Sequence, residues 1–395
     1  MKLNKILVLI ILFSFLTPVF APRLLSAQTA IPWWLSLEYG KQRFRSGEYG
    51  NALILFEDAR RDRRAMYEQL ERNFINFLSL NEVRRIGDSL ERVERYSYDR
   101  YFTAASAALE ELYFRVPKEN FNNSALAALG AFDKLKNFPE AEYWIGEIFR
   151  IQGELTLALS QYQKAYSMRA SLENPGFGTS ILYKMAGIHG IRQEYNEMER
   201  ILLSIIAELD TLWSNAGVAD ANRINANTTL SYAQASASFA RTGMTRVLQE
   251  NGITRLLEMY RYDNGAVEEA HRLLGFYYVV RGRAGAQPHL MFAFLIQNTI
   301  IIEEIRRRKF DFSFTDLSAL VEEINRNQLL LTYIDEVEYF KTAYYLGAAL
   351  LRNGHSSVAR SLWSFLASES QAGEWHNRAV MQLRDPRPEP VIERP

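Results

Sequence analysis

The chain has 395 residues, of which 46 are basic and 46 are acidic, so its formal net charge is zero at pH 7. A balanced charge is a poor profile for a nucleic-acid-binding protein, which needs an excess of cations. The absence of cysteine excludes a disulfide framework, a thiolate metal site and a lipid-modified bacterial lipoprotein.

Residues 1–27 have the layout of a secretory signal peptide. Lys2 and Lys5 precede an apolar run at residues 6–16, and Pro18 and small residues follow it. We expect cleavage after Ala27, which makes the mature protein a soluble component of the bacterial periplasm or cell envelope. The alternative is an uncleaved anchor, although the apolar run is shorter than the roughly 20 residues that span a bilayer. Cleavage leaves a slight excess of acidic residues.

A motif of small and aromatic residues recurs three times along the chain. Each copy has a glycine, a second glycine seven residues later, a small residue five further on, then an aromatic residue and a small or apolar one. The copies are Gly40, Gly47, Ala52, Phe56 and Ala59; Gly146, Gly153, Ala158, Tyr162 and Ala165; and Gly347, Gly354, Ala359, Trp363 and Leu366. A motif repeated with constant internal spacing predicts a helical repeat array.

The spacing of residues within the motif has a physical reason. The first glycine allows two helices to cross closely, and the second ends the first helix by taking left-handed backbone angles. The alanine, the aromatic residue and the last residue follow the i, i+4, i+7 stripe by which a second helix is buried. A hairpin of this kind cannot bury its apolar face alone and must stack on its neighbours.

These residues give the chain a resemblance to the tetratricopeptide repeat family. Weaker copies begin at Met185-Ala186, with Gln193 in place of the second glycine, and at Leu274-Gly275, with Gln287 in place of the alanine. A fainter copy surrounds Ala235, Phe239 and Gly243, and Gly252 interrupts its second helix. The resemblance implies an all-α fold, a right-handed superhelical solenoid of antiparallel helix pairs over residues 28–380. An unrelated helical bundle is the alternative.

The intervals between copies predict further, degenerate helices. We expect helices at residues 81–96, 101–114 and 124–136, with Pro139 starting the next one, and at residues 290–309 and 316–331, with Thr315 as the N-cap of the last. The apolar stretch 290–302 contains polar residues and is too short to span a membrane, so we interpret it as a buried helix. The proline-containing residues 381–395 predict an extended tail.

The sequence contains no recognisable catalytic constellation, and we expect no catalytic residues, cofactor or metal. No metalloprotease, nucleophile-elbow, phosphate-loop or dinucleotide motif is present. The five histidines are isolated, and acidic pairs such as Glu268-Glu269 diverge on a helix. We interpret the run of basic residues at 306–309 as the closure of a helix C-terminus, where cations complement the helix dipole.

The remaining candidate for function is the concave face of the array. In the tetratricopeptide family, ligand contacts come mainly from the first helix of each pair. Carried over to this chain, the partner-binding residues are Trp34, Leu37, Lys41 and Arg45; Glu140, Tyr143, Glu147 and Arg150; and Lys341, Tyr344 and Arg352. Aromatic residues mixed with long charged side chains suit a protein or peptide segment.

The sequence therefore predicts a non-enzymatic scaffold of the bacterial envelope that holds a partner's segment in the groove of a repeat array. Two alternatives stay open. One is a small-ligand-binding accessory of an envelope transporter, with a pocket near Gly243 and Gly252. The other is a helical cell-wall hydrolase, which needs a glutamic acid as general acid in a dry pocket.

Overall fold

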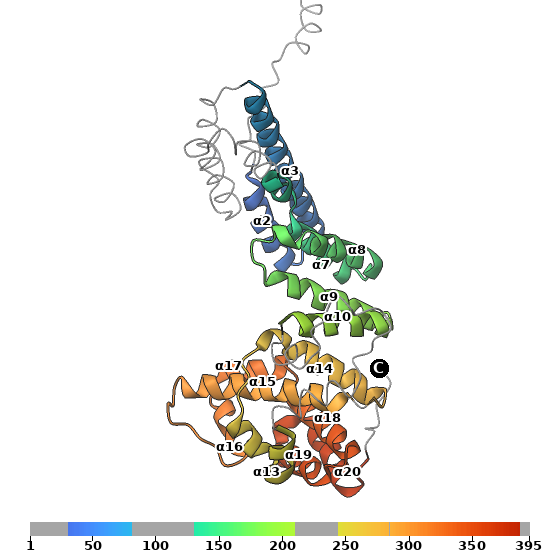
Figure 1. Cartoon of the computed structure of the whole chain (residues 1–395), viewed down its shortest axis with the longest axis vertical. Helices are drawn as coiled ribbons and strands as arrows, with labels where there is room; N and C mark the ends of the chain where they lie inside the picture. The colour runs from blue at the N-terminus through green and yellow to red at the C-terminus, as the bar shows by residue number, and fades with distance from the viewer. Residues whose placement is uncertain (1–30, 81–129, 210–243, 284, 388–395) are drawn as a thin grey trace, which may run out of the picture. The chain divides into compact units, whose positions relative to one another are not determined.

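The computed structural model describes residues 31–80, 130–209, 244–283 and 285–387, and all regular secondary structure in these ranges is helical. The all-α prediction is confirmed for this part of the chain, and the helices pack in pairs joined by short turns (Figure 1). The chain divides into two compact units, Met1–Gly178 and Thr179–Pro395. The single array over residues 28–380 stays a prediction. Residues 1–27, two of the expected helices (81–96 and 101–114) and residues 388–395 of the expected tail lie outside the described ranges. The tail begins later than expected, because residues 381–384 are still helical.

The first unit contains two helix pairs. These are α2 (Trp33–Arg45) with α3 (Tyr49–Leu80), and α7 (Pro139–Ile151) with α8 (Leu155–Ser167). Residues 130–136 are also helical, and Pro139 occupies the first turn of α7, as expected. Side chains of α2, α3 and α7 share one core, in which Trp33 and Phe138 meet edge to face at 5.1 Å.

The second unit contains most of the remaining helices. After α9 (Phe177–Ile191), which begins at the boundary of the units, come α10 (Tyr195–Leu209), α13 (Met244–Met259), α14 (Gly265–Val280), α15 (Ala286–Arg306), α16 (Leu317–Asn325), α17 (Gln328–Glu336), α18 (Tyr339–Arg352), α19 (Ser356–Ser368) and α20 (Glu374–Arg384). The packed neighbours include α10 with α14, α14 with α15, α15 with α18, and α18 with α19. Among the described residues, no helix combines the length and the apolar character needed to cross a membrane.

The recurring motif has the geometry that its spacing predicts. A Cβ atom added to Gly40, Gly146 or Gly347 would lie 2.5–2.8 Å from the aromatic ring sixteen residues later, so the first helix crosses the second at its glycine. The second glycine of each copy ends the first helix with a positive φ, at 79°, 81° and 83°. The alanines at the crossing are fully buried: Ala52, Ala158 and Ala359.

The two weaker copies compensate for their departures from the pattern. Gln193 takes the left-handed φ of 60° that a glycine would adopt, and Gly282 takes 64°. Gly275 meets Leu290 instead of an aromatic ring, with 2.5 Å between an added Cβ and Leu290 Cγ. Gln287 is buried where alanine was expected, and its side-chain oxygen accepts a hydrogen bond from Asn353. In the faintest copy, only the break is described: Gly252 kinks α13 with a φ of 80°.

Two details of the helix prediction are wrong. The helix expected at residues 316–331 is two helices, because Asn327 caps a new one by accepting a hydrogen bond from the Leu329 amide at 3.1 Å. The N-cap is Asp316 and not Thr315, since the Asp316 carboxylate accepts from the Ala319 amide at 2.8 Å. The helix at 290–309 corresponds to α15, whose apolar stretch is buried as interpreted.

Candidate functional site

The residues expected on the exposed face of α7 are largely buried. Tyr143 is 7% exposed and packs against Tyr162 and Phe177, at centroid distances of 5.6 and 4.6 Å. Glu147 is 5% exposed, accepts a hydrogen bond from Tyr162 Oη, and pairs with Arg150 at 2.9 Å. Tyr143 and Glu147 were expected on the open, partner-binding face; they are instead covered by Tyr162 of α8 and by Phe177.

The other predicted partner-binding residues differ in how far they are exposed. Tyr344 on α18 is buried between Trp363 and Trp375 and bonds to Gln382. Leu37 is buried, and Glu140 accepts a hydrogen bond from the Glu173 amide at 2.8 Å. The half-buried residues are Trp34, Lys41, Lys341 and Arg352, and Arg45 is exposed. Lys41 and Lys341 each pair with a glutamate three residues earlier, Glu38 and Glu338, at 2.6 and 2.7 Å.

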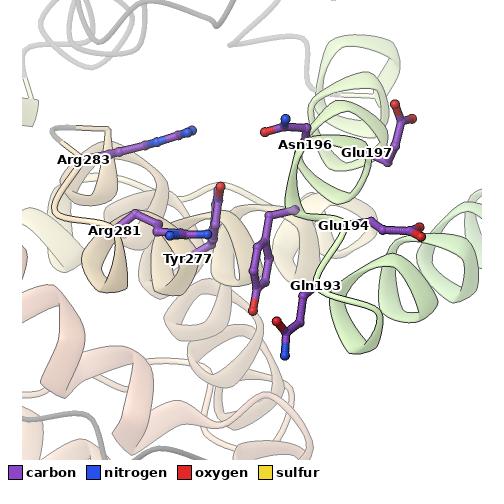
Figure 2. Close-up of a pocket in the computed structure, with 8 residues that line it drawn as sticks. Gln193, Glu194, Asn196, Glu197, Tyr277, Arg281 and Arg283 are labelled. Atoms are coloured by element: carbon purple, nitrogen blue, oxygen red, sulfur yellow. The ribbon is translucent and has the colours of Figure 1, made fainter.

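An open cavity of about 720 Å³ lies in the second unit, between the start of α10 and the end of α14. Its lining residues are Gln193, Glu194, Tyr195, Asn196, Glu197, Tyr277, Arg281 and Arg283. Figure 2 shows Gln193, Glu194, Asn196 and Glu197 on the side of α10, and Tyr277, Arg281 and Arg283 on the side of α14. We call this cavity the α10–α14 groove.

The turns of the two degenerate repeat copies form the groove. Left-handed Gln193 directs the chain from α9 into α10, and left-handed Gly282 directs it from α14 toward α15. Arg281 is the C-cap residue of α14; its amide donates to the Tyr277 carbonyl, and the Gly282 amide donates to the Val279 carbonyl, each at 3.0 Å. The helix packing of α10 on α14 therefore fixes the two walls.

An aromatic platform forms the floor of the groove. The rings of Tyr195 and Tyr277 are stacked, with centroids 5.4 Å apart and planes inclined by 19°. The Arg281 guanidinium lies over Tyr195 at 5.0 Å, and that of Arg283 lies over Tyr277 at 5.2 Å, both within the range of cation–π attraction. Stacked tyrosines beneath arginines are rigid, and rigid aromatic and arginine side chains dominate binding energy at protein interfaces.

Arg283 is also held by an ion pair with a buried carboxylate. Its guanidinium contacts the buried Glu199 carboxylate at 2.6 Å, which accepts a hydrogen bond from Tyr278 Oη at 2.7 Å. Burial and this carboxylate raise the pKa of Tyr278 well above its ordinary value, so the phenol remains a donor. These bonds give the wall a fixed position before any partner arrives.

The described residues contain no group of three or more histidine, aspartate or glutamate side chains able to hold a metal ion. His271 and His289 are buried and face each other, with Nδ1 atoms 2.9 Å apart. Burial first, and then the neighbouring His271, lowers the pKa of His289 well below its usual range. We interpret the pair as a hydrogen bond within the core between α14 and α15.

Sequence reasoning missed Tyr195, Tyr277, Arg281 and Arg283, because it considered the faces of first helices and not the turns between repeats. A signal was present. Aromatic residues and arginines stand within a few positions of Gln193 and Gly282, where the two weakest repeat copies change direction.

Comparison with known proteins finds relatives that are themselves uncharacterized, so it indicates no activity for this chain. The chain is 24% identical over 353 residues to an uncharacterized protein of Treponema pallidum, with 89% of each chain covered. It is 21% identical over 214 residues to an uncharacterized protein of Borreliella burgdorferi, covering 54% of this chain and 65% of that relative. No family model matches the chain.

Proposed function

We propose that this chain is a non-enzymatic, tetratricopeptide-like scaffold of the bacterial envelope, and that its α10–α14 groove holds an extended segment of a partner protein. The observation that carries the proposal is the rigid Tyr195–Tyr277 platform beneath Arg281 in an open cavity. The crossing glycines and turn glycines support the repeat architecture, which stacks helix pairs into a solenoid. The signal-like residues 1–27 support export.

The lining of the groove favours a protein segment over a small apolar ligand. Pockets for small molecules are lined mainly by hydrophobic side chains that enclose the ligand. This groove is lined by charged, amide and tyrosine side chains, with no aliphatic residue among them. Such a surface offers stacking and hydrogen bonds along an extended backbone, as peptide-binding surfaces do.

Blocking the groove should abolish partner capture. Asn196 is exposed on the α10 wall, so Asn196→Trp places a bulky side chain in the cavity without entering the core. We expect a partner that binds the purified chain in a cell extract to be retained at least tenfold less by this variant, at unchanged thermal stability.

The matched control is Asn377→Trp, which adds the same bulk to an exposed position of α20. It should capture the partner as well as the wild-type chain does. Equal capture by both variants would contradict the proposal that the groove is the binding site.

A further inference from the structure

The charges that line the α10–α14 groove are compensated, with one exception. Glu194 contacts His189 and Arg192, each at 2.7 Å. Glu197 contacts Arg200 at 2.7 Å, and Arg283 contacts Glu199 at 2.6 Å. Each of these groups therefore already has an oppositely charged neighbour within the protein.

Arg281 is the exception. Within the described ranges it forms no ion pair, and its guanidinium lies over the rings of Tyr195 and Tyr277, at 5.0 and 5.9 Å from their centroids. It is exposed to solvent, whereas Tyr277 is buried and Tyr195 is half-buried. The groove therefore carries one uncompensated positive charge, at a defined place.

The geometry of Arg281 suits an incoming carboxylate. A guanidinium held by cation–π attraction keeps its five N–H donors for other partners, because that attraction uses none of them as a hydrogen bond. A carboxylate can accept two parallel hydrogen bonds from a guanidinium, which adds direction to the attraction. The tyrosine platform also reduces the number of conformations that Arg281 loses on binding.

We propose that the α10–α14 groove recognises an extended segment through a carboxylate that pairs with Arg281, next to an apolar or aromatic residue that packs beside the half-buried Tyr195 ring. This inference rests on the proposed function and names the chemistry of the partner. The carboxylate is an aspartate or glutamate side chain within that segment, and recognition of a free C-terminus instead is an outcome that the selection below distinguishes.

Selection from random peptides tests the inference without knowledge of the partner. The purified full-length chain is used to select from two phage libraries of linear twelve-residue peptides, one displaying internal segments and one displaying free C-termini. We expect enrichment of Asp and Glu from the first library if side chains are recognised, and enrichment from the second alone if the C-terminal carboxylate is. Fluorescein-labelled copies of the selected peptides should bind Arg281→Gln at least tenfold more weakly.

Two further variants separate charge recognition from structure. Arg246→Gln removes an arginine that is exposed on α13, and it should leave the Kd unchanged. Arg281→Glu should select peptides rich in Lys and Arg from the same libraries, a reversal that damage to the fold cannot produce.

The outcomes distinguish this inference from the proposed function. Peptides that need an open groove, being lost with Asn196→Trp, but that carry no acidic preference and tolerate Arg281→Gln would overturn the carboxylate inference alone. Selected peptides that bind Asn196→Trp as tightly as the wild-type chain would overturn both.

Discussion

Replacing Gly347 by alanine should lower the free energy of unfolding of the second unit by about 1–3 kcal/mol, the usual cost of overpacking a core. The added Cβ would lie 2.6 Å from Nε1 of Trp363. Trp363 is fully buried, and its indole N–H donates to the Tyr344 carbonyl at 3.3 Å, so it has no room to move aside. Urea unfolding followed by tryptophan fluorescence measures the effect.

Gly187 provides the matched control in the same unit. It lies in the middle of α9, is exposed, and an added Cβ would meet nothing within 4 Å. Gly187→Ala should therefore stabilise the protein by about 0.5–1 kcal/mol, because alanine loses less backbone freedom in a helix. In a Trp363→Phe background, which removes the indole nitrogen, the cost of Gly347→Ala should shrink. Equal effects of the two glycine substitutions would show that the crossing geometry is wrong.

The buried carboxyl of Glu268 should make the stability of the second unit fall as the pH rises from 5 to 8. Glu268 is 5% exposed, and one of its oxygens contacts Arg272 at 3.2 Å and Gln297 at 2.6 Å. Desolvation by burial raises its pKa from 4.5 to about 7, against the opposing effect of Arg272. The unfolded chain retains the ordinary value.

The direction of this pH dependence follows from proton binding. Between these two pKa values the folded state holds a proton on Glu268 that the unfolded state has released, so raising the pH favours unfolding. The shift corresponds to about 3 kcal/mol at most, and about 2–3 kcal/mol of it falls between pH 5 and 8. Glu268→Gln removes the titrating group, so it should gain stability relative to the wild type by that amount over this range.

Unfolding in urea at pH 5 and pH 8 measures the difference between the two proteins. Glu269→Gln is the control, because it neutralises the adjacent, half-buried carboxyl. A Glu268→Gln variant whose relative stability is the same at both pH values would contradict the assignment of a protonated buried Glu268.

The helix pairs were predictable because their sequence signals are local. A glycine that contacts an aromatic ring sixteen residues later, as Gly146 does with Tyr162, is fixed by the geometry of one hairpin. The turn glycines are equally local, since only left-handed angles allow the short connection. The division of residues 316–331 into two helices was missed because Asn327 competes with the helix through its own side chain.

The candidate site was not predictable from the same pattern. Whether Tyr143 faces solvent or a neighbouring helix depends on how α8 and Phe177 cover α7, which no repeat spacing specifies. The groove joins Tyr195 and Tyr277, which are far apart in the sequence and are stacked only because α10 packs on α14. Long-range packing therefore decided the site, while local pattern decided the helices.

Site-specific photo-crosslinking in living cells tests most directly whether the α10–α14 groove holds a partner segment. A photoreactive amino acid at position 197, on the groove wall, is compared with one at position 322, where Glu322 is exposed on α16. The account predicts a defined crosslinked partner from position 197 that disappears with Asn196→Trp, and no such product from position 322. The same product from both positions, or one unaffected by Asn196→Trp, would contradict it.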